Sequence, residues 1–126
     1  MNIAFLCILI MGLMPFLFTG IAKFGSKRFN RAANHNPREF MATLEGWPKR
    51  ANWAQFNSFE AFPLFAAGIL VASYNHAPQA TIDLIAMLVV SLRIIYGLLY
   101  IADKARLRSL VWVISLGFTI SLFFVA

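Results

Sequence analysis

The sequence predicts an all-α integral membrane protein, a single domain that crosses the membrane as a bundle of four transmembrane helices. The 126 residues are 60% hydrophobic and only 13% charged, whereas soluble chains carry about 25% charged residues. Four apolar runs are long enough, or nearly so, to cross the ~30 Å hydrocarbon layer. Backbone groups in lipid must be satisfied internally, so each run is expected to be a helix. We place these helices at about residues 2–24, 50–74, 79–103 and 107–125 of one domain (residues 1–126), with a loop at about 25–49.

The first predicted helix is nearly free of polar side chains between Ile3 and Ala22. It lacks the basic n-region and the small-residue cleavage site of a signal peptide, so we expect it to be retained. Its Cys7 is the only cysteine of the chain. A disulfide within one chain is therefore excluded, and we expect a packed apolar thiol.

The second predicted helix is polar in its first half and apolar in its second. Four of its residues are spaced by three, four and three positions, namely Arg50, Trp53, Asn57 and Glu60. This spacing places them on one helix face. Ten residues of helix, ~15 Å, separate Glu60 from Arg50 at the membrane boundary. Glu60 therefore reaches about the middle of the hydrocarbon layer.

The third predicted helix carries a second polar face, formed by Arg93, Tyr96 and Tyr100. Arg93 lies ten residues from Asp103 at the same boundary, which puts it at the depth of Glu60. An isolated charge at the bilayer centre costs roughly 2.5 to 3.5 kcal/mol, so we expect Glu60 and Arg93 to face each other inside the bundle and pair, with Asn57 donating or accepting a hydrogen bond. The pair could be an internal structural contact or the floor of a polar cleft. The polar residues that continue toward the boundary favour the cleft.

The fourth predicted helix is short but almost wholly apolar, and the loops around it set the expected orientation. Seven of the eleven basic residues lie between Lys23 and Arg50, and three more lie in the last connection. The connection YNHAPQ between the second and third helices has no lysine or arginine. The positive-inside rule therefore places both basic loops in the cytoplasm and both chain ends outside. The net charge of +6 is explained by this topology, and no nucleic-acid partner is expected.

The loop at about 25–49 contains signals for a short helix from about Pro37 to Leu44, with Asn36 before it and Gly46 after it. We expect an ordered cap over the cytoplasmic end of the bundle. The two histidines, His35 and His76, stand in loops without other metal-ligating neighbours. No metal site is therefore expected.

The polar segments of the second and third helices resemble the MAPEG family, the membrane-associated proteins of eicosanoid and glutathione metabolism. The segment AQFNSFEAFPLF (residues 54–65) is similar to the helix-two signature of the leukotriene C synthase branch. The segment LRIIYGLLYIADKARLRS (residues 92–109) is similar to the Arg-x-x-Tyr/His-x-x-x-Tyr helix of the prostaglandin E synthase branch. The stretches NHNPRE and LEGW resemble the bacterial branch.

The resemblance implies a homotrimer that binds glutathione as co-substrate between neighbouring subunits, in the bacterial inner membrane. Membrane lipids and small hydrophobic molecules are the other expected partners. The resemblance implies catalytic roles for Arg108, Tyr100 and Tyr96, with Arg108, or less closely Arg106, stabilising the thiolate. The implied substrate-binding residues are Arg50, Gln55, Asn57, Glu60, Arg93, Arg106 and Ser109.

Two departures from the family pattern bear on function. Trp53 stands where the strong enzymes of the family have an arginine, and Ala61 follows the glutamate where the leukotriene branch has a tyrosine.

The expected activity is thiolate attack on a hydrophobic electrophile or reduction of a lipid peroxide. One alternative is a non-catalytic lipophile-binding or scaffold protein on the same fold. Another is a small exporter that uses Glu60, which a permanent cation at Arg93 disfavours because it opposes protonation of the carboxylate.

Overall fold

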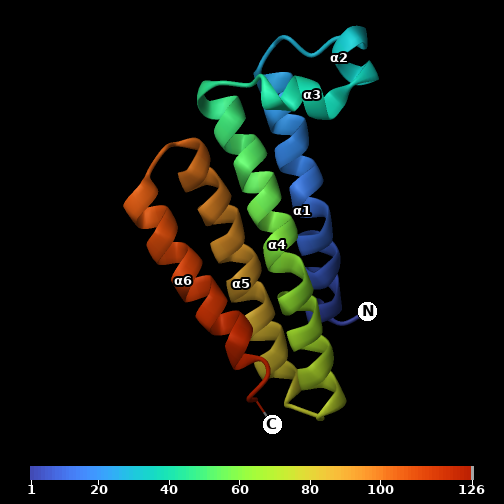
Figure 1. Ribbon diagram of the computed structural model, residues 1–126. Helices are drawn as coiled ribbons and strands as arrows, with labels where there is room; N and C mark the ends of the chain where they lie inside the picture. The colour runs from blue at the N-terminus through green and yellow to red at the C-terminus, as the bar shows by residue number, and fades with distance from the viewer. Residues whose placement is uncertain (126) are drawn as a thin grey trace.

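Residues 1–125, the part of the chain that the computed structural model describes, form six helices and no strand (Figure 1). Their bounds are Ile3–Gly25 (α1), Arg31–His35 (α2), Pro37–Ala42 (α3), Gly46–Tyr74 (α4), Gln79–Ile101 (α5) and Ala105–Ser121 (α6). The predicted all-α class is confirmed.

The long helices α1, α4, α5 and α6 lie side by side. Helix α1 packs against α4 and α5, and α6 packs mainly against α5 and more sparsely against α4. Helix α1 begins and α6 ends at one end of the bundle, and α2 and α3 lie at the other (Figure 1). The buried side chains along the axis are mostly apolar, among them Met11 and Phe18 of α1, Phe65 of α4 and Val89 of α5. Large apolar side chains also cover the outside of the bundle, as expected of a surface that faces lipid.

Three of these helices, α1, α4 and α5, are long and apolar enough to cross a membrane. Helix α6 has 17 residues, which corresponds to about 25 Å of helix against a hydrocarbon layer of ~30 Å. The structure therefore supports an integral membrane protein, and the crossing by a fourth helix stays a prediction.

Side-chain acceptors fix where α1 begins. The Oδ1 atom of Asn2 accepts a hydrogen bond from the amide of Phe5 at 2.8 Å, and Asp83 of α5 accepts one from the amide of Ala4 at 3.0 Å. These contacts satisfy amides that the first turn of α1 leaves free. Helix α3 begins at Pro37, where a short helix was expected, whereas the one-turn helix α2 was not expected.

Two of the long helices differ slightly from their expected bounds. Helix α4 begins at Gly46, four residues before the expected start, and α6 ends at Ser121. Pro48 lies in this added first turn of α4. Proline is tolerated there because the amide it lacks would have no hydrogen-bond partner within the helix. The extension brings Arg50 into the body of the helix.

A glycine permits the close approach of α1 and α5. A Cβ atom at Gly97 would overlap the ring of Phe18, and Phe18 is itself buried in the core. Any larger residue at this position would therefore have to displace a packed aromatic ring.

We predict that Gly97→Ala destabilises the protein by about 1 to 3 kcal/mol, the usual cost of overpacking a core. The matched control is Gly117→Ala, because nothing lies within 4 Å of a Cβ atom there. That control should be neutral or slightly stabilising, since alanine favours helix more than glycine does. Thermal unfolding in detergent, followed by circular dichroism, measures both. Equal stability of the two variants would contradict the close contact.

Candidate functional site

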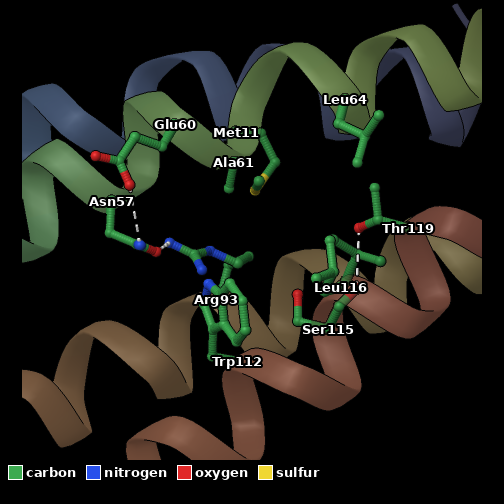
Figure 2. Close-up of a pocket in the computed structure, with 11 residues that line it drawn as sticks. Met11, Asn57, Glu60, Ala61, Leu64, Arg93, Trp112, Ser115, Leu116 and Thr119 are labelled. Carbon is green, nitrogen blue, oxygen red and sulfur yellow. Dashed lines mark hydrogen bonds between the residues drawn. The ribbon is translucent and has the colours of Figure 1, made fainter.

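A buried guanidinium stands at the centre of the candidate site. Arg93 of α5 is only 2% exposed, and its Nη2 atom donates a hydrogen bond to Oδ1 of Asn57 on α4 at 2.7 Å (Figure 2). The guanidinium carbon also lies 4.2 Å from the ring centroid of Tyr96, in cation–π contact. The Nε atom has no hydrogen-bond partner among residues 1–125.

The expected pairing of Glu60 with Arg93 is indirect, and Asn57, which was expected to donate or accept, links the two side chains. No oxygen of Glu60 lies within 4.0 Å of an Arg93 nitrogen, and Asn57 stands between them. Its Oδ1 atom accepts from Arg93, while its Nδ2 atom donates to Oε2 of Glu60 at 3.4 Å (Figure 2). Asn57 and Glu60 share a face of α4, but Asn57 points toward Arg93 whereas Glu60 is exposed at the surface of the single chain (Figure 2).

The exporter alternative was disfavoured because a cation paired with Glu60 would oppose protonation of its carboxylate. Arg93 bonds to Asn57 instead, and Glu60 makes no ion pair with it. The structure therefore does not supply that reason against an exporter.

Aromatic rings continue the site from Arg93 toward the end of α5. Tyr96 and Tyr100 meet edge to face with centroids 5.7 Å apart, and Trp53 of α4 lies 6.3 Å from Tyr100. The guanidinium carbon of Arg108, on α6, lies 4.3 Å from the centroid of Tyr100. Three helices thus contribute to one cluster of two guanidinium groups and two phenols.

Two hollows adjoin this cluster. The outer groove is an open depression of about 350 Å³ whose walls are Trp53, Phe56, Asn57, Glu60, Tyr96 and Tyr100. The inner cavity is a smaller, more enclosed space of about 140 Å³ between α4, α5 and α6. Asn57 and Glu60 line both, so they form the boundary between the two hollows.

The inner cavity contains polar residues that the sequence analysis did not single out. Ser115 and Thr119 of α6 are buried and line it together with Trp112 (Figure 2). The Oγ1 atom of Thr119 donates to the carbonyl of Ser115 at 2.9 Å. The spacing of these three residues, three and four positions apart, was the available signal, because it places them on one face of an otherwise apolar helix.

The remaining predicted site residues are placed differently. Nε of Arg50 donates to the carbonyl of Ile101 at 3.0 Å, so this side chain joins α4 to the end of α5. Gln55 is half-buried and lines neither hollow, and Arg106 and Ser109 are exposed on α6, outside both hollows.

The chemistry available at the cluster is that of an anion site beside apolar walls. Guanidinium groups bind carboxylates and other anions with strong charge-assisted hydrogen bonds, and phenol hydroxyls can donate to an anion. Glu60 offers an acceptor for an ammonium group. In the described part of the chain, no three histidine, cysteine, aspartate or glutamate side chains form a group that could hold a metal ion.

The comparisons with known proteins give one finding. The chain matches the MAPEG family over residues 3–126, nearly its whole length. Neither the curated proteins nor the solved structures gave a match.

We predict that Asn57→Leu destabilises the fold by about 1 to 3 kcal/mol or more, because it leaves the buried guanidinium of Arg93 without its acceptor. The matched control is Gln55→Leu on the same helix, which removes an amide that makes no hydrogen bond with residues 1–125. The control should change stability by less than about 0.5 kcal/mol. Chemical unfolding in mixed micelles measures the free energy of unfolding of both variants. Equal decreases in the two variants would show that the hydrogen bond from Arg93 to Asn57 does not contribute to stability.

Proposed function

Because the chain belongs to the MAPEG family, which includes glutathione transferases and peroxidases, we propose that it is a glutathione-dependent enzyme of the membrane. It attacks hydrophobic electrophiles through the thiolate of glutathione. The observation that carries the proposal is one cluster built from three helices. Asn57 and Tyr100 line the outer groove, Arg93 donates to Asn57 from behind it, and Arg108 stacks on Tyr100.

The proposed binding mode follows the charges along the outer groove. Glutathione carries two carboxylates, one ammonium and one thiol. The Glu60 carboxylate is a partner for the ammonium, and the Asn57 amide is a partner for a peptide group. Arg108 stacks on Tyr100, so its N–H groups remain available at the rim of the ring for an anion.

The proposed chemistry uses Arg108 and Tyr100 to favour the thiolate over the thiol. A cation and a hydroxyl donor near a sulfur stabilise its anionic, nucleophilic form. In the transferase reaction the sulfur forms a bond to the electrophilic carbon, and the leaving group departs with its bonding electrons. Apolar walls such as Phe56 allow the electrophile to enter from the lipid.

We propose that the protein acts as a homotrimer, as in the family, because Glu60 is incompletely satisfied in one chain. Its carboxylate is exposed near the middle of α4, and a charge facing lipid at that depth costs roughly 2.5 to 3.5 kcal/mol. A neighbouring copy that covers this face of α4 would remove the exposure and close the outer groove.

We place the two basic loops in the cytoplasm and the chain in a bacterial inner membrane.

A second candidate function is lipophile binding without catalysis, and a specific observation favours it. Trp53 occupies the wall of the outer groove where an arginine would hold a carboxylate. Arg50, an alternative cation on α4, is engaged with Ile101, and Lys49 lies over the Trp53 ring with its Nζ atom 5.1 Å from the centroid. No arginine therefore lines the outer groove beside Trp53.

Conjugation of glutathione to a chromogenic aryl halide by the purified protein tests the enzyme directly. We predict that Arg108→Ala lowers kcat/KM by about 10² or more, the size of effect seen when one charge-stabilising donor is removed. Lys104→Ala is the control, because Lys104 is an exposed cation at the same end of the bundle. Glutathione binding without turnover in the unmodified protein would support the lipophile-binding candidate instead.

The Trp53 departure yields a gain-of-affinity prediction. If glutathione occupies the outer groove, Trp53→Arg should lower its Kd by about tenfold, because a hydrogen bond to a charged group contributes roughly 1.5 to 3 kcal/mol and part is lost in ordering the side chain. Calorimetric titration with glutathione measures the change. Trp53→Gln, which adds polarity without charge, should bind no more tightly than the unmodified protein. An unchanged Kd for both would place glutathione elsewhere.

The proposed assembly is tested by native mass spectrometry of the protein released from lipid nanodiscs. We expect a complex of three chains, each of 14.2 kDa. A monomer would contradict the covering of Glu60 by a neighbouring copy.

A further inference from the structure

The last residues of α1, the connection to α4 and the first residues of α4 together carry most of the net charge of the molecule. We call residues 23–49 the basic cap; it holds six lysines and arginines against two glutamates, a formal charge of +4. The whole chain has a net charge of +6. The topology rule explains the sign of this charge, but it requires neither a folded segment nor any particular arrangement of the cations.

The basic cap is folded and anchored to the bundle. Met41 and Leu44 are buried in a small core with Ala22 of α1 and Ala51 of α4. Three phenylalanines extend this core outward by edge-to-face contacts, with centroids 5.9 Å apart for Phe24–Phe29 and 5.5 Å apart for Phe29–Phe40. The cations are therefore held on a fixed frame.

The cations divide into two groups on that frame. Three of the six are in contact with aromatic rings: Lys23 lies 4.9 Å from the centroid of Phe29, Arg28 lies 5.8 Å from that of Phe40, and Lys49 lies 5.1 Å from that of Trp53. Lys27, Arg31 and Arg38 are exposed, and no carboxylate of residues 1–125 lies within 4.0 Å of them. These three are free to bind an external anion.

The position of the basic cap puts these cations at a membrane surface. Helix α1 has 23 residues, ~34 Å, so its end reaches the boundary of a ~30 Å hydrocarbon layer. Phe24 and Trp47 are 73% and 42% exposed there, and aromatic side chains favour the headgroup level. Helix α2, which has no buried residue, projects sideways from the bundle (Figure 1). It therefore overhangs the surrounding lipid.

We propose that the basic cap binds the phosphate headgroups of anionic phospholipids, with Arg31 and Arg38 as principal cations and Phe24 at the boundary of headgroups and acyl chains. Charge complementarity selects this partner: a second copy would bring another cap of +4 against the first. Juxtamembrane cations attract anionic lipid in an additive way. The proposal is independent of glutathione binding.

Tryptophan quenching in nanodiscs tests the proposal with Trp47 as the local probe. The background is Trp53→Phe/Trp112→Phe, which leaves Trp47 as the single tryptophan, and the quenchers are brominated phosphatidylglycerol and brominated phosphatidylcholine. We expect phosphatidylglycerol to be preferred. The double variant Arg31→Gln/Arg38→Gln should lower that preference by up to about 30-fold, the size expected for two cations at an anionic surface.

The matched control is Lys104→Gln/Arg106→Gln, which removes two cations from the other basic connection and should leave the preference at Trp47 unchanged. Equal losses in both double variants, or no preference in the parent protein, would overturn the proposal. In the parent protein, 1 M NaCl should abolish the preference, because the Debye length falls to about 3 Å, and its persistence would also count against the proposal. If inorganic phosphate abolishes the preference at an ionic strength where chloride does not, the cap binds free phosphate and the lipid assignment is wrong.

Discussion

The hydrogen bond from Arg93 to Asn57 is the interaction on which the rest of the site depends. A guanidinium that is 2% exposed in the middle of a membrane bundle must have partners, because an unpaired buried charge is very costly. The 2.7 Å bond supplies one partner, and the face of Tyr96 supplies another. The bond to Asn57 joins α5 to α4, whereas the contact with Tyr96 lies within α5 and orients the guanidinium. Further along α5, Tyr100 lies beside Trp53 of α4 and Arg108 of α6.

The same bond explains why Glu60 is left facing outward. Asn57 uses its oxygen for Arg93 and its amide nitrogen for Glu60, so one residue links a buried cation to an exposed acid. The carboxylate keeps accepting capacity for a partner that one chain does not provide. A ligand ammonium, a neighbouring copy, or both would complete it. The geometry thus connects the stability of the bundle to the proposed ligand site and to its proposed assembly.

The fold was largely predictable from the sequence, because length and apolarity identify membrane helices with few alternatives. The gathering of Asn57, Arg93, Tyr96 and Tyr100 was also predictable, since spacings of three and four define helix faces. The surroundings of Arg93 were predicted only in part, because Asn57 was expected to donate or accept there but Glu60 was expected to face Arg93 inside the bundle. Helical rise gives the depth of a residue, but the choice between Asn57 and Glu60 depends on the rotation of α4. Ser115 and Thr119 were missed because isolated hydroxyls in an apolar helix commonly bond to their own backbone.

A double-mutant cycle between Asn57 and Arg93 tests the central claim most directly. Unfolding free energies would be measured for Asn57→Leu, Arg93→Leu and the double variant in the same micelles. The account predicts a coupling energy of about 1.5 to 3 kcal/mol, as for a hydrogen bond to a charged group. It also predicts that the double variant is more stable than Asn57→Leu alone, because the buried charge has been removed. Additive losses, with no coupling between the two positions, would contradict it.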